Sequence, residues 1–434
     1  MSTGGRSGGP ASPSDVLVEA AAANRAGRRS GLTSVCSANR FVLQAALATA
    51  QATGTVALIE STCNQVNQFG GYTGTTPAGF RDQVLALADA AGCDRRRVIL
   101  GGDHLGPHVW RAEPAGAAMA KARDLVRDCV LAGYTKIHLD ASMRLGDDPG
   151  PADAPPDGRL AAERAAELAA AAESAWSGLP PGSPPPVYVV GTEVPVPGGE
   201  LAGPGEITVT RPRDAERTLL ATEDAFRRAG LSAAWSRVLA LVVQPGVDFG
   251  RATVVRYDRA RARDLVAWLE RLPAPLVFEA HSTDYQTADA LAQLVADHFA
   301  VLKVGPALTV ALREAVFELE EAGQVARRTD AGGSSVSVGR ALDRAMRRDP
   351  RHWRPYADSD DDLARAAYGL NDRVRYYWAV PEVERALARL LADLTAAGAA
   401  IEVAPGVSAG DPATFIRERI ADELAPYVAA CGAR

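Results

Sequence analysis

VALIESTCNQVNQFGGYTGTTPAGFRDQVLALADAAGCDRRRVILGG, residues 56–102, is the stretch that decides the fold class of this chain. Two short apolar runs, VALIE at residues 56–60 and VILGG at residues 98–102, enclose a segment of helical periodicity at residues 81–91. Short runs rich in β-branched residues predict strands, and an amphipathic helix between two of them predicts a β-α-β unit with parallel strands.

The same alternation continues in both directions along the chain. Eight parallel strands in about 270 residues fit a (β/α)8 TIM barrel, whose usual size is about 250 residues. A doubly wound open sheet would carry a glycine-rich phosphate fingerprint after its first strand, and none follows Ser37. The apolar runs lie at residues 33–37 (TSVCS), 56–60 (VALIE), 98–102 (VILGG), 135–140 (TKIHLD), 187–193 (VYVVGTE), 238–244 (VLALVVQ), 276–281 (LVFEAH) and 300–305 (AVLKVG).

The chain divides into three predicted parts. Residues 1–23 begin with a small, polar segment and are predicted to form a flexible N-terminal tail. Residues 24–310 form the α/β barrel. Residues 311–434 are mostly helical in period and interrupted by AGGSS and PRHWRP, so we expect a helical C-terminal extension that packs near the barrel mouth.

Composition narrows the function classes. Of 434 residues 47% are hydrophobic, and 47 basic against 53 acidic residues give a net charge of −6, which argues against a nucleic-acid or membrane-surface protein. The start of the chain lacks the apolar core of a signal peptide, and no uncharged apolar run reaches the roughly 18 residues of a membrane span. Five scattered cysteines without a C-x-x-C pair indicate reduced thiols, so we expect a cytoplasmic protein.

Polar residues gather at the predicted strand ends. Because alternate residues of a barrel strand point inward and the carboxyl ends build the active site, these side chains are expected at one mouth. Each alone is more often a salt-bridge partner, but five carboxylates facing two ammoniums would be balanced by a divalent cation. The set comprises Glu60, Asp103, Lys136, His138, Asp140, Glu193, Gln244, Glu279, His281 and Lys303.

Ligand type favours an open metal site with three protein ligands. His104 and His281 follow distant strands, and Gln244 ends a strand where a third ligand is wanted. Two imidazoles and an amide oxygen would leave coordination positions for substrate oxygens. The cation is expected to be Zn²⁺, with Co²⁺, Ni²⁺ and Mn²⁺ as alternatives.

Two further segments are candidate substrate contacts. The loop NQVNQFGGYTGTTP at residues 64–77, which contains Asn67, either binds a polyhydroxy substrate or forms a turn-rich cap. The segment LNDRVRYYW at residues 370–378 places Arg375 on a helical face that either closes over the mouth and binds an anion or stays solvated.

Several long blocks then carry a family resemblance that runs from about residue 24 to the C-terminal region. The blocks are SVCSAN, IESTCNQVNQFGGYTG, GGDHLGP, KIHLDAS, GTEVPVPGG, VVQPGV, EAHSTDYQT, LKVGPALT and RVRYYW. Together they resemble the Z-subunit family of tagatose-1,6-bisphosphate aldolase (GatZ/KbaZ type), which is related to the class II aldolases.

The resemblance implies roles for individual residues. Asp103-His104 matches a pair in which the Asp is the acid/base and the His binds zinc, and His281 matches a second ligand. Gln244 stands where those relatives have another His, which puts ordinary aldolase activity in doubt. The sequence Ser282-Thr283-Asp284 replaces a glycine-rich phosphate loop, so an unphosphorylated or singly phosphorylated sugar is expected.

The resemblance also implies a metal-dependent enzyme that acts on a tagatose- or fructose-type ketohexose or its phosphate, by 4-epimerisation or retro-aldol cleavage. The alternative is a non-catalytic subunit that stabilises a partner aldolase chain, and a homo-oligomer is compatible with both. We expect Asp103 and Glu193 to be the acid/base pair. The residues expected to contact substrate are Glu60, Asn67, Lys136, Asp140, Glu279, Ser282, Asp284, Lys303 and Arg375.

Overall fold

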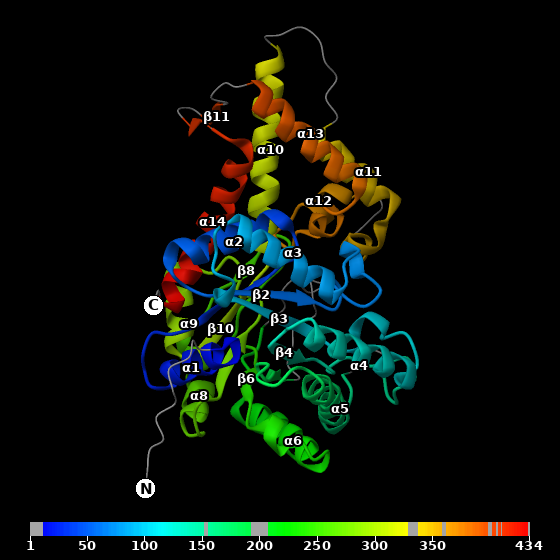
Figure 1. The fold of residues 1–434 in the computed structure, drawn as a ribbon, viewed down its shortest axis with the longest axis vertical. Helices are drawn as coiled ribbons and strands as arrows, with labels where there is room; N and C mark the ends of the chain where they lie inside the picture. Colours follow the sequence, from blue (N-terminus) through cyan, green and yellow to red (C-terminus); the bar gives the residue numbers. More distant parts are fainter. Residues whose placement is uncertain are drawn as a thin grey trace.

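Eight parallel strands close into a barrel, which confirms the predicted (β/α)8 fold (Figure 1). The computed structural model describes residues 12–151, 155–191, 207–328, 337–357, 362–397, 402–404, 407–408 and 410–432. The hydrogen-bonded order is β1-β10-β9-β6-β5-β4-β3-β2, with β2 returning to β1. The barrel strands are β1 (Leu32–Cys36), β2 (Ala57–Thr62), β3 (Val98–Leu105), β4 (Lys136–Leu139), β5 (Val187–Val190), β6 (Val238–Val242), β9 (Val277–Ala280) and β10 (Phe299–Val304).

Helices follow the strands and cover the outside of the barrel. The first, α2, starts where the Asn39 side chain accepts the N–H of Phe41 and ends at Gly54, which adopts the left-handed conformation with φ 72°. A short hairpin of β7 (Asp248–Phe249) and β8 (Val254–Val255) interrupts the loop after β6. The covering helices are α2 (Arg40–Thr53), α3 (Pro77–Ala90), α4 (Ala115–Leu131), α5 (Gly158–Ser177), α6 (Pro212–Arg228), α7 (Ser232–Trp235), α8 (Arg259–Glu270) and α9 (Ala288–Ala296).

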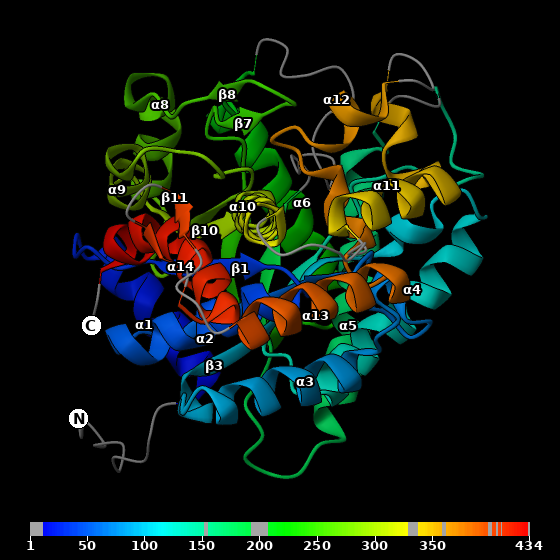
Figure 2. The ribbon, with the colours of Figure 1, turned by 90° about the horizontal axis from the view of Figure 1, so that it is seen from above.

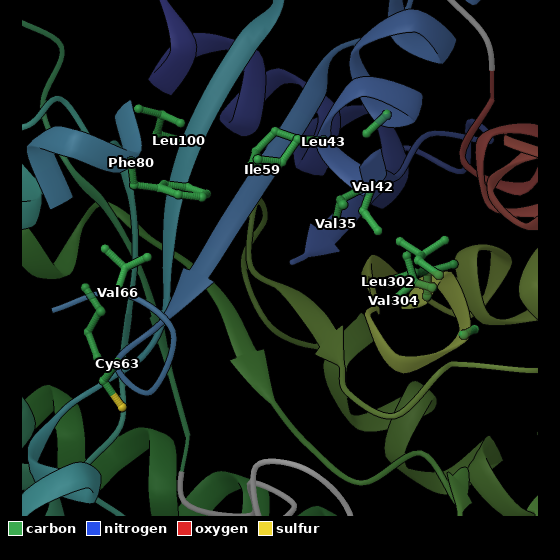
Figure 3. Packing of buried hydrophobic residues seen from close by; sticks show 14 of the residues in the cluster. Val35, Val42, Leu43, Ile59, Cys63, Val66, Phe80, Leu100, Leu302 and Val304 are labelled. Carbon is green, nitrogen blue, oxygen red and sulfur yellow. The ribbon is translucent and has the colours of Figure 1, made fainter. Parts of the chain in front are cut away.

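Strand alternation separates two cores. Ile59 of β2 points outward and packs with Leu43 and Phe80 of the covering helices (Figure 3). Its neighbour Leu58 points into the barrel and joins the inner apolar cluster. Glu60, two residues further along β2, is also inside and fully buried. The barrel interior is therefore apolar toward one end and charged toward the mouth.

Helix α1 (Pro13–Arg25) closes the apolar end of the barrel. The hydroxyl of Ser12 accepts the N–H of Asp15, and the Asp15 carboxylate accepts the N–H of Ser12, so the helix begins with a capping box. Val16 and Leu17 are buried in the inner cluster. The prediction of a flexible tail to residue 23 is therefore wrong from residue 12 onward, because the apolar residues of this segment repeat with helical period and cover the apolar end of the barrel.

The C-terminal extension leaves the barrel and returns to it (Figures 1 and 2). Helix α10 (Pro306–Arg328) rises from β10, and α11 and α13 lie along it above the mouth. The last helix, α14 (Pro412–Cys431), packs against α2, α9 and β1. It occupies the position of the eighth outer helix of the barrel. The further elements are α11 (Val338–Arg348), α12 (Leu363–Ala367), α13 (Pro381–Ala397), β11 (Glu402–Ala404), β12 (Val407–Ser408) and the 3₁₀ turns η1 (Gly71–Thr73), η2 (Arg95–Arg97), η3 (Pro107–Trp110), η4 (Pro350–His352), η5 (Arg354–Tyr356) and η6 (Arg373–Tyr377).

The predicted boundary at residue 310 therefore differs from the structure in one respect. Residues 412–431 belong to the barrel wall, where Ile416 and Ile420 are fully buried. The Tyr427 hydroxyl donates to the backbone oxygen of Thr283, at 2.7 Å, and the Gly31 N–H donates to the backbone oxygen of Cys431. In the described part of the chain, no helix has the length and apolar character to cross a membrane.

We predict that Ile420→Ala destabilises the barrel as much as a change in its central core. A fully buried isoleucine replaced by alanine loses transfer free energy and leaves a cavity, which costs about 2–5 kcal/mol. The measurement is the free energy of unfolding in denaturant. The exposed neighbour Glu418, changed to Ala, is the control and should alter the free energy of unfolding by less than about 0.5 kcal/mol. Equal effects of the two changes would contradict the assignment of α14 to the barrel wall.

Candidate metal centre and active site

A network of buried charges forms the floor of the barrel mouth. The Nζ of Lys136 lies 2.7 Å from an oxygen of Glu60 and 2.7 Å from an oxygen of Glu279. The Nζ of Lys303 lies 3.2 Å from Glu60 and 3.3 Å from Glu279, and it also pairs with Asp103. Ser34 donates its hydroxyl to Glu60 at 2.6 Å. Inward-facing positions of five different strands therefore satisfy one another's charge.

The carboxylates keep both lysines charged. Burial lowers the pKa of the Lys136 ammonium, but Glu279 and Glu60 outweigh it and the net shift is upward. Burial also lowers the pKa of the Lys303 ammonium, but the nearby carboxylates, Asp103 above all, outweigh burial and raise this pKa well above its ordinary value. The pKa of Glu279 is held well below its ordinary value by Lys136 and Lys303, against the effect of burial. Neither lysine offers the neutral amine that a Schiff-base nucleophile requires.

Three buried histidines lie above this floor, and one ring nitrogen of each contacts a different carboxylate. A carboxylate in this position fixes the orientation and tautomer of a metal-binding imidazole and directs its other nitrogen elsewhere. The pairs are His104 with Asp140 (2.8 Å), His138 with Asp103 (2.9 Å) and His281 with Glu279 (3.0 Å).

The three histidines lie close together and close to Asp103. The three ring centroids lie 5.0, 4.9 and 5.2 Å apart. One potential ligand atom from each of Asp103, His104, His138 and His281 lies within 4.8 Å of the others. Nε2 of His138 is buried and has no hydrogen-bond partner among the described residues. A buried nitrogen without a partner is costly, and a cation bound to these residues would satisfy it, so the residues present fit a divalent transition metal.

The histidines differ in protonation. Burial, reinforced by the nearby Lys303 ammonium, lowers the pKa of His281 to about 3, so its imidazole is neutral. Burial also opposes protonation of His104, but the Asp103 and Asp140 carboxylates raise its pKa. Burial opposes ionisation of Asp140 as well, but the hydrogen bond to His104 holds its pKa well below the ordinary value.

A cavity of about 110 Å³ lies against His104 and His281. Asp103, His104, His281 and Lys303 line it from the barrel. Residues from outside the barrel strands line it as well: Tyr72 of η1, and Arg375 and Tyr376 of η6. A larger hollow of about 440 Å³ adjoins it near α2, α3 and α13 and shares the lining residues Cys36, Gln65, Tyr72, Gly305, Pro306 and Arg375. The extension therefore contributes residues to the lining of the cavity.

Arg375 lines the cavity. Of the two positions that its sequence allowed, over the mouth or in solvent, it therefore takes the one over the mouth. Its guanidinium donates to the backbone oxygens of Asn371 and Asp372 and to the hydroxyl of Tyr376, at 2.9 Å. The carboxylate of Asp372 accepts from Thr309 at 2.5 Å and pairs with Arg313 of α10. These contacts fix η6 to the helix that rises from the barrel.

Ser282 and Asp284 also line the cavity, after β9. Oδ1 of Asp284 accepts the backbone N–H groups of Gly305 (3.0 Å) and Ala307 (2.8 Å). These groups belong to the start of α10, after the last barrel strand, where many barrel enzymes bind phosphate. In this chain a carboxylate occupies those donors.

Several predicted site residues lie elsewhere. The Oε1 of Gln244, predicted as the third metal ligand, accepts the backbone N–H groups of Gly246 (2.7 Å) and Val247 (3.0 Å) and so stabilises its own turn. His138 takes its place in the cluster. The Asn67 side chain likewise stabilises its own loop, because its oxygen accepts the backbone N–H of Phe69 at 2.8 Å. Glu193 lies outside the described residues.

The other predicted contacts fall into two groups. The cavity is lined by Ser282, Asp284, Lys303 and Arg375. A second group lies beneath the cavity or behind the histidines, where it positions other side chains, and consists of Glu60, Lys136, Asp140 and Glu279. Sequence reasoning did not assign Tyr72 and Tyr376. The period-two spacing of Lys136, His138 and Asp140 was the signal that could have identified His138 as a ligand.

We predict that His138→Ala lowers the affinity of the chain for Zn²⁺ and Co²⁺ by about 100-fold or more, because it removes a ligand nitrogen. Isothermal titration of the metal-free protein measures this, and the circular dichroism spectrum verifies folding. Gln244→Ala is the matched control and should change the affinity by less than about threefold. If Gln244→Ala lowers the metal affinity as much as His138→Ala does, the Gln244 amide is a metal ligand after all.

We also predict a pH-dependent stability from Asp284. Burial raises the pKa of its carboxyl to about 6, against the opposing hydrogen bonds from Ala307 and Gly305. The folded protein then binds this proton more tightly than the unfolded chain, whose aspartates titrate near about 4, so stability falls as pH rises from about 4 to about 6. The unfolding free energy of metal-free Asp284→Asn, minus that of wild type, should rise by up to about 3 kcal/mol between pH 4 and pH 7. A difference independent of pH would contradict the shift.

Known proteins resemble this chain over nearly its whole length. A model of the family described as D-tagatose-1,6-bisphosphate aldolase subunit GatZ/KbaZ-like matches residues 17–432. A relative from Klebsiella pneumoniae subsp. pneumoniae, named D-tagatose-1,6-bisphosphate aldolase subunit GatZ, is 48% identical over 374 residues, which are 86% of each chain. A protein of the same name from Salmonella agona is 43% identical over 422 residues, 94% of this chain and 97% of the relative.

A solved structure is also similar to this chain. It is described as a probable tagatose 6 phosphate kinase from Sinorhizobium meliloti 1021, is 40% identical, and superposes with a TM-score of 0.79. The match covers 92% of this chain and 100% of that chain. Both the family model and the curated relatives extend over more than two thirds of the sequence, and the chain therefore belongs to the D-tagatose-1,6-bisphosphate aldolase subunit GatZ/KbaZ-like family.

Proposed function

We propose that this protein is a divalent-metal-dependent enzyme that converts ketohexoses of the tagatose and fructose type, or their phosphates, by 4-epimerisation through retro-aldol chemistry. The observation that supports it most is the arrangement of three buried histidines, each in contact with its own carboxylate, in a cluster where one potential ligand atom from each histidine and from Asp103 lies within 4.8 Å of the others. Burying this many charges is costly, which favours a catalytic role over a purely structural one. The printed names of the relatives support a tagatose-type sugar as the substrate class.

The metal would be held by His104, His138 and His281, with Asp103 beside them. When bound, a divalent cation supplies Lewis acidity toward the carbonyl and hydroxyl oxygens of the sugar. Zn²⁺ is the expected ion, and Co²⁺, Ni²⁺ and Mn²⁺ suit the same ligands.

The residues of the chain then divide the remaining work. Asp103, which lines the cavity, takes the proton from the C4 hydroxyl in this proposal, while the C3–C4 bond breaks. The negative charge that develops on the C2 oxygen is stabilised by the Lys303 ammonium, which lines the same cavity and is held in its charged form by Asp103, Glu279 and Glu60. Tyr72 and Tyr376 help to cover the cavity.

The proposal predicts that the purified chain, loaded with Zn²⁺, Co²⁺, Ni²⁺ or Mn²⁺, interconverts fructose and tagatose or their 6-phosphates. Removal of the metal by EDTA should abolish the conversion, and Asp103→Asn should lower kcat by about 10²–10⁴-fold. Products are resolved by chromatography. Turnover that persists after the metal is removed would refute the metal dependence.

A second part of the experiment distinguishes an enzyme that acts alone from a subunit that depends on a partner. The chain is assayed alone and with an added class II tagatose-bisphosphate aldolase chain, with tagatose 1,6-bisphosphate among the substrates. Conversion by the chain alone supports the proposal. If conversion occurs only in the presence of the second chain, and Asp103→Asn leaves it unchanged, the protein is a stabilising subunit and the proposed function is wrong.

A further inference from the structure

Tyr376 reaches the cavity from the extension, on η6. Its ring stacks on the imidazole of His352 at a centroid distance of 4.3 Å and an interplanar angle of 3°. Tyr72 contacts its ring edge-on at 4.8 Å. Tyr376 and Tyr72 both line the cavity that Asp103, His104 and Lys303 line from the barrel. The phenol is therefore fixed in place at a site whose chemistry the barrel strands otherwise supply.

Two guanidiniums meet at the phenol oxygen. Arg375 donates to it at 2.9 Å and Arg373 at 3.3 Å, and both guanidiniums also lie over the ring, at 4.5 and 4.8 Å from its centroid. Arg373 is fixed in turn by the backbone oxygen of His352 (2.7 Å) and by the ring of Tyr356 (3.9 Å). This arrangement stabilises a phenolate on a residue that lines the cavity.

The surroundings of Tyr376 are cationic or aromatic. Its charged and titratable neighbours are Arg373 and Arg375 on its own turn, Tyr72 on η1 and His352 on η4. The two arginines lower the pKa of Tyr376, although burial opposes them. The adjacent Tyr377 differs, because its hydroxyl donates to the backbone oxygen of Asp349 at 2.6 Å and burial raises its pKa.

We propose that Tyr376 is a second acid/base residue of this site. It donates a proton to the C4 oxygen of the ketose after the aldehyde fragment has rotated and presented its other face. The inference rests on the proposed epimerase function and names a proton carrier that comes from the extension. A 4-epimerase must remove a proton from one configuration at C4 and return one to the other, so a single base on one side of the sugar is not enough.

Asp103 takes the O4 proton, the O4 electron pair forms the C4 carbonyl, and the C3–C4 electrons form an enediolate with its charge on the C2 oxygen. The aldehyde rotates and presents its other face. The enediolate carbon C3 attacks C4, the C3–C4 bond forms again, and O4 takes the proton of the Tyr376 phenol. Arg375 and Arg373 stabilise the resulting phenolate, and proton exchange with water resets Tyr376 and Asp103.

Tyr376→Phe tests the assignment in the metal-loaded full chain, with Tyr377→Phe as the matched control. Epimerisation between fructose and tagatose should fall by about 10²-fold or more in Tyr376→Phe. Cleavage of the ketose, measured by trapping the released aldehyde, should fall by less than about 10-fold, so that the ratio of cleavage to epimerisation rises. The control should stay within about threefold of wild type in both reactions. A purely structural role would lower both reactions together and leave their ratio unchanged.

A second measurement does not depend on turnover. Spectrophotometric titration of the metal-free protein should show one tyrosine that ionises below the ordinary range and is missing from Tyr376→Phe. An identical titration of both proteins, or epimerisation by Tyr376→Phe at the wild-type rate, overturns the assignment while the proposed function stands. A wild-type chain that is inactive with every metal overturns the proposed function and the role of Tyr376 with it.

Discussion

The ion pair of Lys136 with Glu60 and Glu279 is the interaction on which the rest of the site depends. An ammonium and two carboxylates with no solvent exposure are costly unless each charge is met at short range, and these contacts are 2.7 Å. Glu279 also orients His281, and Lys303 links Glu60 and Glu279 to Asp103, which orients His138. Fixed side-chain charges in the floor therefore set the direction in which two of the three histidines present their free nitrogens.

The barrel could be predicted from sequence because each β-α unit is local. A strand and the helix after it lie within about 50 residues of each other, and the period of the apolar residues separates the two. The eighth outer helix could not be predicted, because α14 comes about 100 residues after β10 and its sequence does not indicate which strands it covers. Helix α1 was missed for a related reason: its apolar face contacts strands that are distant in sequence.

The site was predictable where strand alternation alone determines it. Asp103, His104, His281 and Lys303 meet at the cavity because inward positions at strand ends converge. Gln244 shows the limit of that reasoning, since the turn after β6 directs its side chain onto the Gly246 and Val247 amides. Arg375 of η6 was an expected substrate contact, but its pattern left a solvated position open and did not indicate Tyr376, because the approach of η6 is set by the buried Asp372–Arg313 pair between η6 and α10.

The position of α14 has a consequence for biosynthesis. During translation the eight strands and the covering helices α2 to α9 emerge first, but the groove between α2 and α9 stays open until residues 412–431 leave the ribosome. The apolar side chains of that groove face water until then, so the nascent chain exposes an aggregation-prone hydrophobic surface while the extension is synthesised. A ribosome that stops early releases an unclosed barrel, and a complete chain is closed by its own last helix.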